Sequence, residues 1–208
     1  MFDVQGLILS APAILFGLTI HEFSHGLVAW RLGDPTAKMM GRLTLNPLKH
    51  LDPIGTIALF LFRFGWAKPV PIDPRNFRHP TRDMAISSLA GPGANLVTAA
   101  VAGLVLRGLL LFHVGGFVAM LTTYFVLFNL ILCFFNLIPI PPLDGSRLVY
   151  HLLPPNLAAG YARLERYGFI ILIAVILLGQ LTSVNILWLY MNPLLRLFSH
   201  LFVGQPIV

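Results

Sequence analysis

Long apolar runs alternate with short polar stretches along this chain. The extended runs cover Leu7–Trp30, Met84–Phe112, Gly116–Ile138 and Phe169–Phe202. A helix rises about 1.5 Å per residue, so roughly 20 apolar residues cross the core of a bilayer. Polar residues interrupt the last run, which predicts either two short spans or one span with an interfacial helix. The pattern predicts an all-α polytopic membrane protein.

A further apolar stretch, Ile54–Phe62, is too short for an ordinary span, because nine residues of helix reach only about 14 Å. Both of its flanks are basic, and basic loops stay in the cytoplasm. The stretch is therefore expected to enter the membrane and return on the same side, as a re-entrant segment. The N-terminus then lies outside, and the first and third spans end on the cytoplasmic side. The flanking basic residues are Arg31, Lys38, Arg42, Lys49, Arg63, Lys68, Arg75, Arg78 and Arg82.

We therefore expect a bundle of about five transmembrane helices with one re-entrant segment. The "GRLTL" stretch, residues 41–45, alternates apolar and polar positions as a strand does. This alternation predicts a short β-hairpin between the first and second full spans. The exposed edge of such a strand could pair with an unwound substrate segment, although an ordinary connecting hairpin fits the pattern equally well.

Composition agrees with a membrane protein. Hydrophobic residues make up 57% of the 208 residues and charged residues 11%, whereas soluble domains carry roughly 25% charged residues; the mean hydropathy is +0.81. We expect one integral membrane domain over 1–208, with a core at 7–148 and C-terminal helices at 167–203. The net charge of +6 lies in the gaps between apolar runs, so no nucleic-acid partner is expected. Cys133 is the single cysteine, which excludes an internal disulfide and a cysteine-rich zinc site.

The first apolar run contains the ionisable residues of "HEFSH". His21 and His25 are four residues apart, so a helix places both imidazoles on one face, where they can share a tetrahedral zinc ion. Glu22 lies about 100° around the helix and can hold a zinc-bound water as general base. Ionisable residues inside a span are rare and typical of functional sites. The alternative is a pair of core histidines bonded to polar neighbours, with Glu22 an isolated carboxylate.

A catalytic zinc needs a third protein ligand. Asp144 is the strongest candidate, because it stands alone in a proline-rich turn that closes the run Gly116–Ile138, and Gly145 follows it. Asp52 and His50 are weaker candidates beside the re-entrant segment. The remaining carboxylates and histidines either lie on the outer side or stand among basic loop residues; they include Asp3, His113, Asp73, His79, Asp83 and Glu165.

Two motifs together resemble the site-2 proteases, the intramembrane zinc metalloproteases. These enzymes pair H-E-x-x-H on one transmembrane helix with N-x-x-P-x-x-x-x-D-G on another. "HEFSH" matches the first motif, and "NLIPIPPLDG" matches the second through Asn136, Pro139, Asp144 and Gly145. "AGPGAN", residues 90–95, also resembles the family. The likeness extends to about residue 148 and is to the compact form, which has neither a PDZ domain nor a cystathionine-synthase-like domain.

The resemblance implies that His21, His25 and Asp144 bind one zinc ion per chain and that Glu22 acts as base and acid. Asn136 would lie near the reacting carbonyl, or else cap the end of its helix. Asn95 would either bond a neighbouring helix or contact substrate. Gly91 and the adjacent residues 92–93 permit a bend and a close helix contact.

We therefore expect an intramembrane zinc endopeptidase that cleaves transmembrane or membrane-anchored proteins near the cytoplasmic face of a prokaryotic cell membrane. The expected partners are the lipid bilayer and a membrane protein substrate whose transmembrane helix is locally unwound; the sequence leaves a homo-oligomer open. A membrane zinc transporter would need further metal-binding residues along a path. A catalytically inactive protease-like scaffold would have no need of Glu22.

Overall fold

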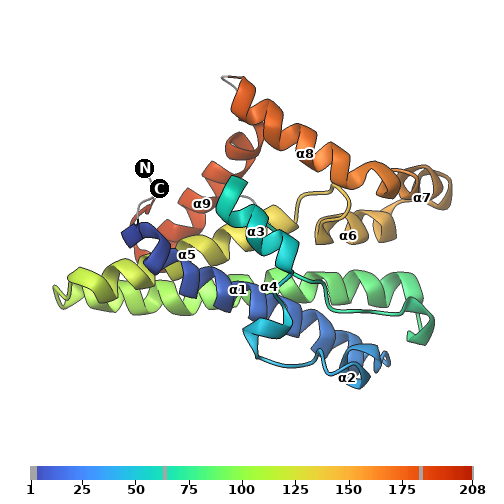
Figure 1. Cartoon of the computed structure of the whole chain (residues 1–208), viewed down its shortest axis with the longest axis horizontal. Helices are drawn as coiled ribbons and strands as arrows, with labels where there is room; N and C mark the ends of the chain where they lie inside the picture. Colours follow the sequence, from blue (N-terminus) through green and yellow to red (C-terminus); the bar gives the residue numbers. More distant parts are fainter. Residues whose placement is uncertain (1–3, 63–64, 183–184, 208) are drawn as a thin grey trace.

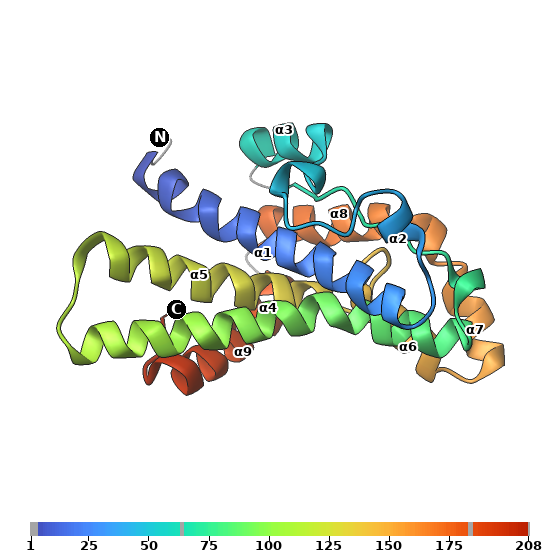
Figure 2. The ribbon, with the colours of Figure 1, turned by 90° about the horizontal axis from the view of Figure 1, so that it is seen from below.

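Three long helices lie side by side and form the core of the molecule. The computed structural model describes residues 4–62, 65–182 and 185–207. Helices α1 (Val4–Arg31), α4 (Pro80–Leu111) and α5 (Gly116–Asn136) pack against one another (Figures 1 and 2). α4 and α5 are antiparallel and joined by a short turn, in which His113 has φ 55° and Gly116 φ 73°. Their apolar faces provide the packing surface on which the other elements rest.

Short elements gather at one end of this three-helix core. They are α2 (Thr36–Met39), η2 (Pro74–Asn76), α6 (Asp144–Leu152) and α7 (Pro155–Ala162). α1 ends there and α4 begins there, whereas α5 ends partway along α4, as Figure 2 shows. We call this the α6 end. The turn between α4 and α5 and the end of the last helix lie at the opposite end (Figure 2).

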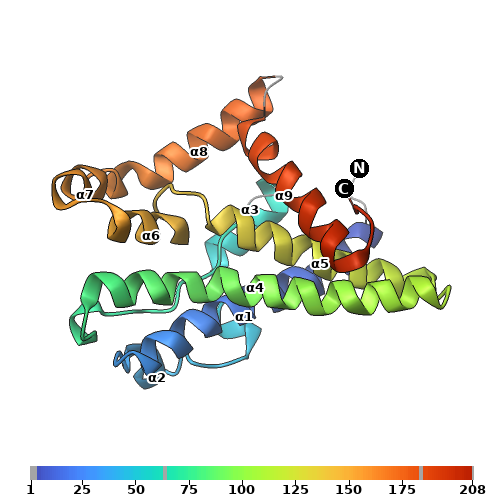
Figure 3. The ribbon, with the colours of Figure 1, turned by 180° about the vertical axis from the view of Figure 1, so that it is seen from behind.

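The last apolar run is broken into two helices, α8 (Glu165–Leu181) and α9 (Ile186–Val203). They meet at an angle, with α8 starting beside α7 and α9 ending at the opposite end of the molecule (Figure 3). Asn185 caps α9 by accepting a hydrogen bond from the Trp188 amide at 3.0 Å. Met191 and Leu195 of α9 join the apolar core shared by α4 and α5. The expected interruption of this run is therefore present.

Within the part of the chain that the structure describes, three helices are long and apolar enough to cross a membrane by length and composition, namely α4, α5 and α9. α1 has 28 residues but carries the ionisable residues of HEFSH, and α8 has 17 residues. The expected count of about five spans is therefore not confirmed. The mostly helical architecture and the membrane character of the chain agree with the sequence prediction.

The predicted β-hairpin at 41–45 is wrong. Within the described ranges no strand is formed, and only an isolated bridge joins Leu51 and Ala67. Residues 41–45 fold into turns instead, in which the Thr44 amide donates to the Arg42 carbonyl at 3.0 Å. The Arg42 side chain is buried and donates to the Lys68 carbonyl at 2.8 Å. This tertiary contact outweighs the local alternation, so no strand edge is available there for a substrate.

The short apolar stretch forms helix α3 (Pro53–Phe62), which follows the turn η1 (Pro47–Lys49). α3 stands apart from the three-helix core (Figure 2). Asp52 starts it, because its carboxylate accepts the Gly55 amide at 2.7 Å and its carbonyl accepts the Thr56 amide at 2.8 Å. Ile54 and Ile57 are exposed, as expected for side chains that face lipid. The re-entrant course of α3 stays a prediction.

Cysteine labelling tests the re-entrant course. Single cysteines replace Lys49 and Arg75, which are both exposed, in a background where Cys133 is alanine. An impermeant thiol reagent is expected to label both positions from the same side of the membrane, and a cysteine at exposed His113 from the other side. Labelling of positions 49 and 75 from opposite sides would mean that α3 crosses the membrane.

Candidate metal centre

The two histidines of α1 lie one turn apart and point to the same place. Their Nε2 atoms are 3.0 Å apart, and the two rings meet edge to face with centroids separated by 4.5 Å. His21 is 5% exposed and His25 7%. The helical spacing thus produces the predicted pair of imidazoles, buried against α4.

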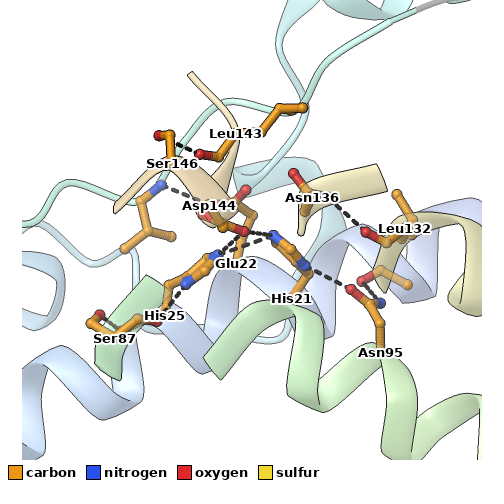
Figure 4. Close-up of polar contacts among 12 residues, drawn as sticks. His21, Glu22, His25, Ser87, Asn95, Leu132, Asn136, Leu143, Asp144 and Ser146 are labelled. Carbon is orange, nitrogen blue, oxygen red and sulfur yellow. Dashed lines mark hydrogen bonds and ion pairs between the residues drawn. The ribbon is translucent and has the colours of Figure 1, made fainter. Parts of the chain in front are cut away.

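Asp144, the first residue of α6, completes a group of three. Its Oδ2 atom lies 3.1 Å from Nε2 of His21 and 3.2 Å from Nε2 of His25 (Figure 4). Among the described residues searched, these side chains form a cluster able to hold a metal ion. The structure therefore brings together the ligands expected from two motifs that stand more than one hundred residues apart in the sequence.

α6 packs against α4, and its first turn lies close to Leu137, the residue that follows α5; this packing delivers Asp144 to the histidines. A Cβ atom on Gly145 would stand 2.2 Å from the Leu137 carbonyl oxygen. The preceding loop is held by the Ser146 hydroxyl, which donates to the Leu143 carbonyl at 2.6 Å. Gly145 does not have a positive φ. Its smallness, rather than the turning freedom expected from the sequence, is what the site requires.

The three ligand atoms fit a zinc ion. Tetrahedral ligands at about 2.0–2.1 Å from zinc stand roughly 3.3 Å from one another, and these atoms are separated by 3.0–3.2 Å. Oδ2 of Asp144 is buried and accepts no hydrogen bond, although a buried carboxylate oxygen normally has a partner. Two imidazoles and one carboxylate form a donor set typical of catalytic zinc, which leaves a fourth position for water.

Both imidazoles are oriented from behind by α4. Nδ1 of His21 lies 2.6 Å from Oδ1 of Asn95, and Nδ1 of His25 lies 2.7 Å from the Ser87 carbonyl oxygen. Such hydrogen bonds place the proton on Nδ1, so each Nε2 presents its lone pair to the metal. Asn95 is completely buried and contacts His21, as one of its two expected roles, a bond to a neighbouring helix, requires.

α4 passes directly beneath the ligands. A Cβ atom on Gly91 would stand 2.4 Å from Nε2 of His25 and 2.7 Å from Nε2 of His21. No real Cβ atom tolerates such distances, so a glycine is required at this position. The close helix contact predicted from "AGPGAN" is confirmed here, and it lies at the metal centre itself.

Glu22 lies beside the group and is held by an extended segment, residues 67–73. Its Oε2 atom accepts the Val70 amide at 2.8 Å. The segment is fixed near its start through the Lys68 carbonyl, which accepts from Arg42 at 2.8 Å. At its other end, the Asp73 amide donates to Oδ2 of Asp34 at 2.8 Å. The carboxylate of Glu22 is therefore oriented by a loop rather than by a helix.

The anchor Asp34 stays ionised at neutral pH. Burial by itself would raise the pKa of its carboxyl, but hydrogen bonds from Thr36 and Asn76, together with the Asp73 and Thr36 amides, hold the pKa below its usual value. The carboxylate thus accepts the Thr36 hydroxyl at 2.5 Å and the Asn76 amide at 2.7 Å. A charged acceptor of this kind makes stronger hydrogen bonds than a neutral one.

The weaker sequence candidates lie elsewhere. Asp52 caps α3, and His50 is buried with Nε2 2.8 Å from the Thr44 carbonyl oxygen; neither belongs to the group of three. Asn136 ends α5 close to the site (Figure 4), where its Nδ2 donates to the Leu132 carbonyl at 2.9 Å. Sequence reasoning missed Ser87 and Val70, whose contacts with Nδ1 of His25 and with Glu22 are made by backbone atoms and leave no signal. It also missed Asn129, which is buried. This residue could have been singled out, because it is an asparagine inside the apolar run Gly116–Ile138.

Comparisons with known proteins agree with this centre. The profile of peptidase family M50 matches residues 109–179, the part that contains Asp144. A Bacillus subtilis (strain 168) protein named "Putative zinc metalloprotease YwhC" is 40% identical to this chain; the match covers 94% of the chain and 92% of that protein.

More distant relatives carry the name "Putative zinc metalloprotease Rip2". The protein of Mycolicibacterium smegmatis (strain ATCC 700084 / mc(2)155) is 34% identical over 78% of this chain, and that of Mycobacterium tuberculosis (strain ATCC 25618 / H37Rv) is 31% identical over 81%. The matches cover 64% and 66% of these relatives. A search of solved structures found no match.

Replacement of Gly91 tests the geometry of the centre. Gly91→Ala is expected to remove most of the bound zinc, because the added methyl group would occupy the space of both imidazoles. Gly93→Ala is the matched control on the same helix, since its Cβ atom meets nothing within 4 Å. Zinc content of the purified proteins, with thermal unfolding as a check of folding, gives the result. Full zinc content in Gly91→Ala would contradict the arrangement described here.

Proposed function

Because the chain belongs to peptidase family M50, the family of the site-2 proteases, we propose that it is an intramembrane zinc endopeptidase. It cleaves transmembrane or membrane-anchored protein substrates near the cytoplasmic face. The observation that carries this proposal is the convergence of His21, His25 and Asp144 on one point, with Glu22 beside them. The family and the names of the relatives support the broader statement that the chain is a membrane zinc metalloprotease.

His21, His25 and Asp144 are the residues that would hold one zinc ion per chain. When bound, zinc polarises the scissile carbonyl and lowers the pKa of a coordinated water toward about 7. The two Nδ1 hydrogen bonds fix the directions of the imidazoles, so the protein need not reorganise these ligands when the metal arrives. Asp144 contributes one negative charge, which offsets part of the charge of the ion.

Glu22 is the proposed general base and acid. It accepts a proton from the attacking water and later delivers that proton to the nitrogen of the leaving amine. The Val70 amide holds one of its oxygens, which fixes the carboxylate beside the ligands and leaves the other oxygen for the water. A role of this kind explains why a carboxylate follows His21 without joining the ligand group.

Asn136 is the proposed contact for the reacting carbonyl. One N–H of its side-chain amide is used by the Leu132 carbonyl, and an amide group has a second N–H to donate. Its place at the end of α5, where the chain turns toward Asp144, supports this role (Figure 4). Asn95 is better explained as a support for His21, because it is fully buried and both ends of its amide are bonded.

The proposed substrate is a membrane protein whose transmembrane helix is locally unwound. A helical carbonyl is hydrogen-bonded and shielded, so it must be released before water can attack it. Glycine, proline or asparagine near the cut would weaken the helix and favour cleavage. The lipid bilayer is the second partner. We propose no nucleic-acid partner. Assembly into a homo-oligomer is compatible with this function.

We place the active site toward the cytoplasmic side of a bacterial cell membrane. Support comes from the basic residues of the α6 end, which follow the positive-inside rule, and from the bacterial relatives. Asp144 begins α6, and the histidines lie in the second half of α1, so the centre lies nearer to this end. The basic residues of the α6 end include Lys38, Arg75, Arg78, Arg82, Arg147, Arg163 and Arg166.

Replacement of Glu22 separates a protease from a zinc transporter or an inactive scaffold. Glu22→Gln is expected to retain zinc and to lower cleavage of a transmembrane substrate by at least about 100-fold, the usual contribution of a general base. Glu165→Gln is the control, because this exposed carboxylate pairs with Arg147 away from the ligands. Normal cleavage by Glu22→Gln would refute the proposed mechanism.

Replacements of Asp144 test the third ligand. Asp144→Asn removes the charge and is expected to lose most zinc and all turnover while the helices stay folded. Asp144→Glu keeps the charge but moves the oxygen by about one methylene; zinc should stay bound and activity fall about 100-fold, because catalytic geometry tolerates little displacement. Asp52→Asn should keep both zinc and activity. Zinc content and cleavage are measured together, and loss of metal in Asp52→Asn with a normal Asp144→Asn would reverse the assignment.

A further inference from the structure

Two asparagines are buried in the middle of the three-helix core. Asn95 of α4 and Asn129 of α5 are both 0% exposed. Neither belongs to the group of three ligands. A polar group buried in an apolar environment costs free energy unless it is hydrogen-bonded, and this cost is greater inside a membrane, where no water replaces a missing partner. Hydrogen bonds must therefore offset the cost of burying these two side chains.

The two side chains form a continuous chain of hydrogen bonds that ends on His21. Nδ1 of His21 lies 2.6 Å from Oδ1 of Asn95. Nδ2 of Asn95 donates to the Gly17 carbonyl at 3.0 Å and to Oδ1 of Asn129 at 2.9 Å. Nδ2 of Asn129 donates to the Phe125 carbonyl at 2.9 Å. The chain thus joins α1, α4 and α5 at the level of the metal centre.

Backbone carbonyls fix the direction of every bond in this chain. A carbonyl oxygen can only accept, so the Asn129 atom beside the Phe125 oxygen must be its nitrogen, and its other end is an oxygen. The Asn95 atom that lies between the Gly17 carbonyl and this oxygen must then be a nitrogen as well. The remaining end of Asn95 is an oxygen, which can only accept a hydrogen bond, so Nδ1 of His21 carries the proton and donates to it.

The direction of the chain determines the tautomer of His21. With its proton held on Nδ1, the imidazole presents an unprotonated Nε2 toward Asp144 and His25, as metal binding requires. His25 reaches the same state by a different route, because its Nδ1 faces a backbone carbonyl, that of Ser87. His21 therefore depends on side chains for its orientation, whereas His25 depends on the main chain.

The sequence of α1 makes room for this arrangement. A Cβ atom on Gly17 would stand 3.1 Å from Oδ1 of Asn129 and 2.7 Å from Cδ1 of Leu132. The glycine thus lets α5 approach α1 closely enough for Asn129 to reach Asn95. One turn further along α1, His21 occupies the same face of the helix.

We propose that Asn129 and Asn95 form a positioning relay that sets the tautomer and the ring orientation of His21 for zinc binding. Asn95 contacts His21 directly, and Asn129 acts through Asn95 by fixing which way its amide points. This inference rests on the metal centre of the proposed function. Helix packing alone would predict lower stability in relay variants, with no selective effect on His21.

Zinc affinity is measured by competition with a chelator on the purified full-length protein in detergent. Asn95→Leu removes the acceptor and is expected to weaken zinc binding about 10- to 100-fold, as is typical when the partner of a ligand histidine is lost. Asn95→Asp keeps the acceptor for Nδ1 of His21 but loses the N–H that donates to the Gly17 carbonyl and to Asn129, so it should bind zinc more tightly than Asn95→Leu and less tightly than the wild type. Thr98→Val is the control on the same helix, because its hydroxyl donates only to the Ala94 carbonyl of α4, and it should not change the affinity.

A double-mutant cycle tests whether Asn129 acts through Asn95. Asn129→Leu should weaken zinc binding less than Asn95→Leu does, because the Gly17 carbonyl still orients Asn95. Asn95→Leu/Asn129→Leu should bind zinc no more weakly than Asn95→Leu alone. Additive losses in the double variant would mean that Asn129 acts independently, and would overturn the relay.

A cobalt-substituted sample gives a readout that helix packing would not change. Paramagnetic Co²⁺ shifts the Nδ1 proton of each bound histidine away from the other proton signals. The wild type should give two such protons that exchange slowly with solvent. In Asn95→Leu the His21 proton should exchange rapidly while the His25 proton stays slow. Unchanged exchange of both protons in Asn95→Leu would overturn the proposal.

The outcomes separate this inference from the proposed function. A wild-type protein that binds and cleaves normally, together with an Asn95→Leu variant of wild-type affinity, would overturn the relay and leave the protease proposal intact. A wild-type protein that binds no zinc at the three ligands would overturn both. Thermal unfolding of every variant identifies any loss of binding that is due to misfolding.

Discussion

The metal centre is governed by one constraint: a polar atom buried among apolar side chains must have a partner. His21, His25 and Asp144 all stand in apolar surroundings, and each histidine nitrogen that faces away from the centre is hydrogen-bonded. The atoms that face the centre contact only one another, at 3.0–3.2 Å, and the buried Oδ2 of Asp144 accepts no hydrogen bond. Because an unpartnered carboxylate oxygen is costly, this group of atoms is suited to hold a cation.

Small residues allow the helices to meet this constraint. Gly17, Gly91 and Gly145 each stand where a Cβ atom would collide with a neighbouring element. α4 thereby reaches the histidines, α5 reaches α1, and α6 reaches the end of α5. In membranes, close approach of this kind replaces much of the hydrophobic driving force that joins helices in water. The three glycines belong to three different helices. What they share is the absence of a side chain, and this permits the close contacts.

The sequence predicted those features that depend on local spacing. His21 and His25 share a face because a helix repeats every 3.6 residues or so, and Asp144 could be identified because few other carboxylates were unexplained. The hairpin at 41–45 failed because burial of Arg42 against Lys68, a contact between distant segments, decides that region. Ser87 and Val70 could not be found, since any residue supplies the same backbone atoms. Asn129 could have been found, because a lone asparagine deep in an apolar run needs a partner.

Metal binding and base orientation rest on different parts of the chain. The ligands and their supports lie on α1, α4, α5 and α6, which are held by helix packing. Glu22 is oriented by residues 67–73, and that segment is fixed by Arg42 and Asp34, which lie in the loop after α1. The helices that carry the candidate ligands pack against one another, whereas the segment that holds Glu22 is fixed by individual hydrogen bonds to two side chains. Glu22 itself belongs to α1, between the two histidines, so a change in segment 67–73 would alter the direction of its carboxylate without displacing His21, His25 or Asp144.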